Sequence, residues 1–201
     1  MSKSDQVKTL TRRNVLAVMA LLGGTALASR PSFASPEQYV TQLGTTVVKL
    51  ASSGASKSSL RSRFASIVKG NSDVRSIGLQ ALGPYRKKLP ANRQGEFVGL
   101  LSTYIAAFFV YYLKEFQGTG IEVKSSAISG GATIVNSVVT KKSGGGTEVR
   151  WRVLGGSRVG DINVRGVWLT LQLKKRFTDV LKSSGGDFDA LFAELKSAQD
   201  W

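Results

Sequence analysis

The hydrophobic period of this 201-residue chain changes at Gly118. Before Gly118, apolar residues recur at the three- and four-residue intervals of helices that bury one face. After it, apolar and polar residues alternate, as they do in strands with one buried face. Because helices come first and strands second, the sequence predicts an α+β domain, in which N-terminal helices pack on a curved, mainly antiparallel C-terminal sheet.

The first half of the chain carries recognisable helix starts. Ser35-Pro36-Glu37 supplies a capping hydroxyl, a proline suited to the first turn and an acidic residue near the N-terminal end. Asn71-Ser72-Asp73 can cap a later helix that ends before Gly83-Pro84. The expected helices are residues 36–51, a second helix with Leu60, Phe64, Ile67 and Val68 on its apolar face, residues 74–82, and a longest helix over residues 91–117.

The longest expected helix carries an aromatic stripe. At 100° per residue, one broad side of it collects Phe97, Leu101, Tyr104, Phe108, Tyr111 and Tyr112. Phe109, Leu113 and Phe116 extend the apolar surface toward a second side. Two compatible interpretations stay open: a central core helix, and a helix with part of its stripe against a ligand cavity.

The second half of the chain predicts antiparallel hairpins separated by glycine-rich turns. The expected strands are residues 121–128, 132–140, 147–154, 161–164 and 167–173. Two short helices, residues 175–182 and 187–197, are expected to close a single domain over residues 35–201.

The N-terminal segment resembles an export signal. Arg12 and Arg13 form a positive region, residues 15–22 are apolar, and Ser32-Phe33-Ala34 fits a small-x-small cleavage site. The apolar run is shorter than the roughly 20 residues of a spanning helix. We therefore expect residues 1–34 to be removed on export, by either the twin-arginine or the general secretory route.

Composition favours binding over catalysis. The chain has 28 Lys and Arg against 13 Asp and Glu, a formal charge of +15. Five of these basic residues and one acidic residue lie in residues 1–34, so the rest carries +11. Cysteine and histidine are both absent, which removes disulfides, thiolate nucleophiles, Ser-His-Asp triads and the usual zinc sites.

Several motifs, taken in order, resemble the MlaC family, the toluene-tolerance or HpnM-type periplasmic lipid carriers. The first half supplies Ala81-Leu82-Gly83, Arg93-Gln94 and Phe97. The second half supplies, in order, Trp151-Arg152-Val153, Asp161-Ile162-Asn163-Val164-Arg165-Gly166-Val167, Phe177, and Gly186-Asp187-Phe188-Asp189-Ala190-Leu191. Arg165 stands where the family pattern has Glu.

The resemblance implies a soluble periplasmic shuttle for phospholipid or, in the HpnM branch, hopanoid. Such a carrier exchanges lipid with an inner-membrane ABC transporter that bears an MCE-domain protein and with an outer-membrane lipoprotein–porin complex. It implies no reaction, no cofactor, no metal and no nucleic acid, and we expect a monomer.

A carrier needs an apolar cavity, since each exposed acyl CH₂ costs about 0.8 kcal/mol in water. We expect the cavity between the helices and the sheet. Its expected lining is Phe97, Leu101, Tyr104, Ile105, Phe108, Tyr112, Trp151, Val153, Val164, Leu169 and Leu171. The expected headgroup or docking residues are Lys87, Lys88, Lys174 and Arg176, although a solvated basic surface is the simpler interpretation of these four residues.

Two other functions remain open from the residues alone. One is a small α+β enzyme that uses a carboxylate, for which Asp161 is the best candidate because it opens a strand among apolar neighbours. The other is a cationic module for cell-wall polymer or nucleic acid. The second is disfavoured because most aromatic residues lie on an apolar helix rather than among basic residues on exposed strands.

Overall fold

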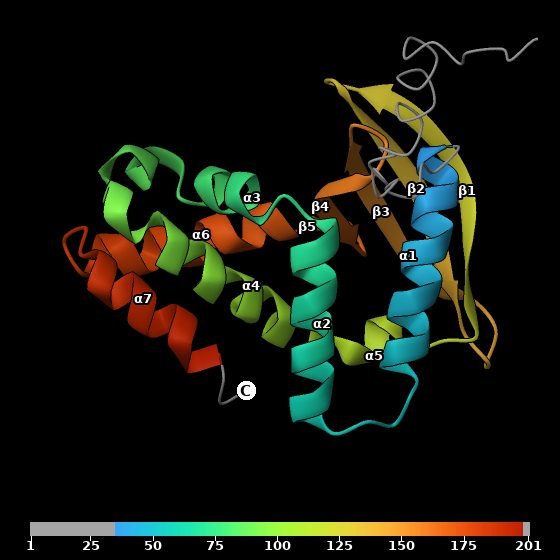
Figure 1. Ribbon diagram of the computed structural model, residues 1–201. Helices are drawn as coiled ribbons and strands as arrows, with labels where there is room; N and C mark the ends of the chain where they lie inside the picture. Colours follow the sequence, from blue (N-terminus) through green and yellow to red (C-terminus); the bar gives the residue numbers. More distant parts are fainter. Residues whose placement is uncertain (1–34, 199–201) are drawn as a thin grey trace, which may run out of the picture. The chain divides into compact units, whose positions relative to one another are not determined.

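The computed structural model describes residues 35–198, and the expected export signal lies outside them. Its helices are α1 (Pro36–Ala51), α2 (Lys57–Asn71), α3 (Val74–Ala81), η1 (Gly83–Lys88), η2 (Ala91–Arg93), α4 (Gln94–Tyr111), α5 (Leu113–Phe116), α6 (Leu169–Ser183) and α7 (Phe188–Ser197). Its strands are β1 (Gly120–Ser129), β2 (Ala132–Thr140), β3 (Gly146–Leu154), β4 (Arg158–Val164) and β5 (Val167–Trp168). Figure 1 shows α1 lying along β1 and β2 on one side of α2. Helices α3, α4, α6 and α7 lie on the other side of α2.

The five strands form one open antiparallel sheet in the order β1-β2-β3-β4-β5. Burial alternates along β3, where Val149, Trp151 and Val153 are buried and Arg150 is exposed. The prediction of helices on an antiparallel sheet in an α+β domain is therefore confirmed.

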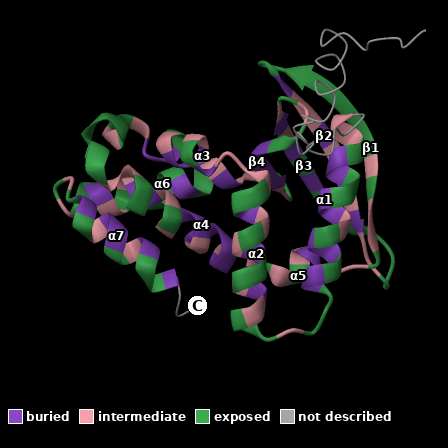
Figure 2. Cartoon of the chain, in the orientation of Figure 1, coloured by how far each residue is buried: buried purple, intermediate pink, exposed green. Residues whose placement is uncertain are grey.

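Helix α1 begins where the sequence predicts, because the Ser35 hydroxyl accepts a hydrogen bond from the backbone N–H of Gln38 at 3.3 Å. Its buried face packs on the sheet, and Figure 2 shows α1 and α2 each with a buried and an exposed side. Gly44 allows the close approach, since a Cβ there would collide with the side chain of Ile121. The absence of a side chain at Gly44 thus lets α1 lie close to β1.

The expected helix over residues 91–117 is interrupted. It starts as the 3₁₀ turn η2, continues as α4, breaks at Tyr112 and resumes as the short α5. The Lys141 ammonium donates to the carbonyls of Lys114, Glu115 and Gln117 at 2.6, 3.2 and 2.7 Å. These bonds satisfy carbonyls at the end of α5 and hold it beside the β2–β3 turn.

The expected strand over residues 167–173 is wrong beyond Trp168. Helix α6 begins at Leu169 and absorbs the expected helix over residues 175–182. Leu169, Leu173, Phe177 and Leu181 lie four residues apart and are all buried, so a helix buries all four on one side. Asp161 favours this outcome by accepting a hydrogen bond from the backbone N–H of Thr170, in the first turn of α6.

None of the helices within residues 35–198 is both long and apolar enough to span a membrane.

Candidate functional site

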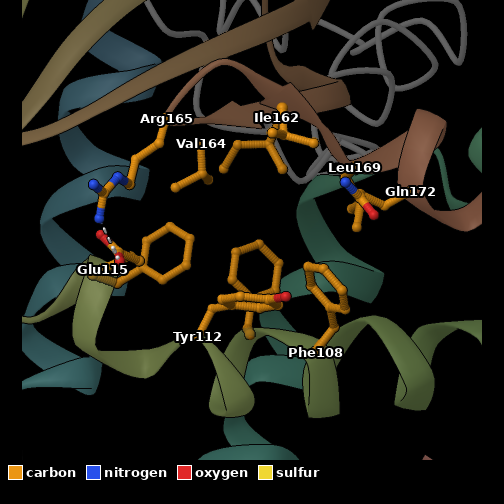
Figure 3. A pocket seen from close by; sticks show the side chains of 11 residues that line it. Phe108, Tyr112, Glu115, Ile162, Val164, Arg165, Leu169 and Gln172 are labelled. Atoms are coloured by element: carbon orange, nitrogen blue, oxygen red, sulfur yellow. Dashed lines mark hydrogen bonds and ion pairs between the residues drawn. The ribbon is translucent and has the colours of Figure 1, made fainter.

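An open cavity of about 320 Å³ lies between α4–α5, the end of β4 and the start of α6. This first cavity is lined by Phe108, Phe109, Tyr112, Glu115, Phe116, Ile162, Val164, Arg165, Val167, Leu169 and Gln172. In Figure 3, Phe108 and Tyr112 form one wall, and Ile162 and Val164 lie opposite. The volume falls at the lower end of the range for small-molecule sites.

Paired aromatic rings build one wall of the first cavity. The ring centroids of Phe108 and Tyr112 lie 4.7 Å apart, and those of Phe109 and Phe116 lie 4.9 Å apart. Phe108 and Phe109 lie in the last turn of α4, Tyr112 lies at the break between α4 and α5, and Phe116 ends α5. The wall is therefore apolar and consists of side chains rather than backbone.

A smaller cavity of about 40 Å³ lies deeper, between α1, α2 and the sheet. It shares Phe109, Ile162 and Leu169 with the first cavity. Phe109 also stacks on Phe64 of α2, with ring centroids 5.6 Å apart. The ring of Phe109 thus lies between the open cavity and this inner cavity.

A third cavity, about 490 Å³ and more open, lies on the other side of Phe108, Tyr112 and Gln172, which line it together with the first. Lys57 and Arg176 also line it. Arg176 makes a two-bond ion pair with Glu194 at 2.7 and 2.9 Å, and the Tyr104 hydroxyl donates to the same carboxylate at 3.2 Å. Burial, followed by the nearby Glu194 charge, raises the pKa of Tyr104 to about 12.

One end of the first cavity carries an ion pair. The Arg165 guanidinium lies 3.2 Å from the Glu115 carboxylate, whose second oxygen accepts a hydrogen bond from the Thr147 hydroxyl at 3.1 Å. Figure 3 shows this pair at one end of the cavity and Gln172 at the other. Apart from these groups, the lining side chains are apolar or aromatic.

Asp161, the carboxylate considered for catalysis, holds a structural position. A single oxygen, Oδ1, accepts from the backbone N–H groups of Ile162 at 2.9 Å and Thr170 at 3.1 Å. Burial raises the pKa of this carboxyl, and the hydrogen bonds from Thr170 and Ile162 and the charge of Arg152 oppose the shift. Residues 35–198 contain no group of three carboxylates that could hold a metal ion.

The predicted lining residues divide among the three cavities. The first is lined by Phe108, Tyr112, Val164 and Leu169, the inner one by Ile105, Trp151 and Leu169, and the third by Tyr104, Phe108 and Tyr112. Arg176, expected as a headgroup or docking residue, also lines the third cavity. Phe97, Leu101 and Val153 are fully buried and line none of the three. Leu171 is exposed on α6, and Lys87, Lys88 and Lys174 lie outside these cavities.

Sequence reasoning did not place several lining residues in the site: Phe109, Glu115, Phe116, Ile162, Arg165, Val167 and Gln172. For Phe109 and Phe116, the sequence did contain a signal: both extend the apolar surface of the long helix, which could have placed them in the cavity wall. No periodicity identifies Glu115 and Arg165, because they come from α5 and the β4–β5 turn, fifty residues apart.

These features define an α+β protein with an open, helix-covered sheet and an apolar cavity between helices and sheet. The chain belongs to the MlaC family, whose sequence model, described as "MlaC protein", matches residues 37–197. The predicted family resemblance is therefore confirmed.

The fold is similar to that of a solved phospholipid-binding protein from Ralstonia solanacearum in complex with a phospholipid. The TM-score is 0.67, with 19% sequence identity, and the match covers 82% of this chain and 97% of the other. A comparison with curated proteins finds no significant match.

Proposed function

We propose that this protein is a periplasmic carrier that holds phospholipid acyl chains in its apolar cavity and performs no chemical reaction. The observation that carries the proposal is the first cavity, which is open to solvent, walled by aromatic rings and adjacent to a second, smaller apolar cavity. Membership of the MlaC family and the fold shared with a phospholipid-bound protein support the same ligand class.

The energetics of tail transfer explain why such a cavity is needed. Transfer of an acyl chain of about fifteen carbons from hydrocarbon to water costs on the order of 12 kcal/mol of free energy. A protein that receives the tail in an apolar pocket removes most of this cost. Aromatic and branched side chains suit the task because they present apolar surface without buried donors or acceptors.

The surface around the cavities supports contact with a lipid donor. Three of the five large hydrophobic side chains exposed within residues 35–198 line the first or the third cavity: Tyr111, Tyr112 and Val167. Tyr112 and Val167 line the first cavity, and Tyr111 lines the third. Exposed apolar residues grouped in this way are typical of surfaces that contact other apolar groups.

The proposal includes the family's transport route. The carrier would exchange lipid with an inner-membrane ABC transporter that bears an MCE-domain protein and with an outer-membrane lipoprotein–porin complex. The excess of basic residues supports docking to acidic partners, because opposite net charges accelerate encounter.

Extraction of the purified protein with organic solvent, followed by mass spectrometry, tests the ligand. We expect about one phospholipid per protein in the wild type and almost none in Phe108→Asp, because a carboxylate in the wall would be desolvated by a tail. Ile128→Asp, at an exposed position on β1, is the matched control and should retain lipid. An empty wild-type protein, or a Phe108→Asp variant with full occupancy, would contradict the proposal.

A further inference from the structure

The Glu115–Arg165 pair gives the first cavity one oriented pair of opposite charges. The two side chains face one another at one end of it (Figure 3), with Arg165 Nη1 3.2 Å from Glu115 Oε1. The rest of the lining is apolar or aromatic except for the Tyr112 hydroxyl and Gln172. A ligand that fills this cavity with its tails therefore meets both charges at the same end.

The guanidinium of Arg165 has donors to spare. Its side chain is 71% exposed, and the bond to Glu115 is its one side-chain hydrogen bond within residues 35–198. The backbone of Arg165 is tied to β3 in the β4–β5 turn: its φ is 51°, and its N–H donates to the carbonyl of Glu148 at 3.1 Å. A guanidinium with free N–H groups fits two oxygens of a phosphodiester.

The carboxylate of Glu115 lies among groups suited to an ammonium ion. Its side chain is 26% exposed and is held by the Thr147 hydroxyl at 3.1 Å. The rings of Tyr112 and Phe116 line the same cavity. A carboxylate combined with aromatic faces is the combination that binds primary and quaternary ammonium groups.

We propose that this pair makes the carrier selective for zwitterionic phospholipids, with the phosphodiester on Arg165 and the headgroup ammonium on Glu115. This inference rests on the proposed function. Binding replaces one ion pair by two: Arg165 exchanges Glu115 for the phosphodiester, and Glu115 exchanges Arg165 for the ammonium. No charge is left without an opposite charge. A headgroup with a phosphate and no ammonium places its negative charge near Glu115 with no compensating cation, and like charges at about 4 Å reduce binding about fivefold.

Competition between two lipids measures the selectivity. The full mature protein is incubated with vesicles that contain equal amounts of phosphatidylethanolamine and phosphatidylglycerol, re-isolated, and extracted for mass spectrometry. We expect about a fivefold excess of phosphatidylethanolamine in the wild type. Phosphatidylcholine also carries a positive charge on its headgroup, so it should likewise be bound in excess over phosphatidylglycerol.

Two single variants separate the roles of the charges. Glu115→Gln keeps an acceptor for Thr147 but removes the charge, so the bound ratio should move to phosphatidylglycerol. Arg165→Gln removes the phosphate ligand, so total occupancy should fall while the remaining lipid still favours phosphatidylethanolamine. Glu122→Gln and Arg150→Gln, both at exposed strand positions, are the matched controls and should behave as the wild type.

The outcomes are distinguishable. Full occupancy with the same lipid ratio in the wild type and both variants would overturn the selectivity and leave the carrier function intact. A wild-type protein without lipid would overturn both. Because the wild-type competition needs no substitution, an equal uptake of the two lipids would overturn the inference even if a variant failed to fold.

Discussion

The ring of Phe109 stacks on the ring of Phe64 with centroids 5.6 Å apart, and it separates the first cavity from the inner one. This contact joins α4 to α2 at the point where the sheet, through Ile162, lines both cavities. The side chain of Phe109, together with Ile162 and Leu169, therefore bounds the space available to a ligand in the first cavity.

Phe109→Ala should connect the two cavities. We expect a loss of about 3 kcal/mol in the free energy of unfolding, and a shift of the bound lipid toward longer acyl chains, because the tail gains the inner space. Thermal or urea unfolding measures the first effect, and mass spectrometry of the extracted lipid measures the second. Phe188→Ala in α7, away from the cavities, should lower stability without changing the lipid. An unchanged acyl profile in Phe109→Ala would show that the ring does not limit the tail.

Asp161 predicts a pH dependence of stability. Its folded-state pKa is raised from 3.8 by burial, so its contribution to stability is fully present below pH 3.8 and is lost as the pH rises through the folded-state pKa. Asp161→Asn keeps one acceptor oxygen for Ile162 and Thr170 and removes the charge. Its stability at pH 7 should match or exceed that of the wild type.

Asp161→Ala is the comparison, since it removes the acceptor as well. It should lower the free energy of unfolding by about 1–2 kcal/mol at pH 7. Urea unfolding across pH 3–8 separates the two variants. If Asp161→Asn were as unstable as Asp161→Ala, the charge itself would be required at this position.

Trp151 and Ser137 form a buried hydrogen-bond relay across β2 and β3. The indole N–H donates to the Ser137 hydroxyl at 2.9 Å, and that hydroxyl donates to the carbonyl of Val149 at 2.9 Å. Trp151→Phe should cost about 2 kcal/mol through the lost donor and the lost ring volume. The double variant Trp151→Phe with Ser137→Ala should lose less free energy of unfolding than the two single variants lose together. Full additivity would mean that the two side chains are not coupled.

Lys87 and Lys88 lie at the end of η1, outside the cavities. Replacing both by Glu should slow lipid transfer to anionic vesicles or acidic partners at low salt, and the difference should shrink as salt screens the charges. Lys49→Glu with Lys142→Glu is the control of equal charge change at other exposed positions. A transfer rate equal to that of the wild type, or an equal loss in the control, would argue against docking at η1.

The order of elements was predictable because local signals and burial agree over most of the chain. Ser35 caps α1 as its position indicates, and Asp187 likewise caps α7 by accepting from the Asp189 N–H at 2.8 Å. The strand expected over residues 167–173 is wrong beyond Trp168, because its alternating pattern also places Leu169 and Leu173 on one helical face. A carboxylate from β4, Asp161, supports the helix, and no local pattern reveals that contact.

The candidate site was only partly predictable for the same reason. Phe108 and Tyr112 belong to one helical stripe, so their shared position follows from periodicity. Phe97 and Leu101 belong to the same stripe, yet Phe97 packs against Phe177 and Phe192 in the core. Which part of a stripe meets other helices and which part meets a cavity depends on tertiary packing.

The partition between the first and third cavities consists of the side chains of Phe108, Tyr112 and Gln172. Moving these groups breaks no backbone hydrogen bond in α4 or α6 and needs only rotation about their χ angles. Exposed side chains change rotamer within nanoseconds, far faster than helices separate. A passage between the first and third cavities can therefore open by side-chain rotation alone, without separating α4 from α6.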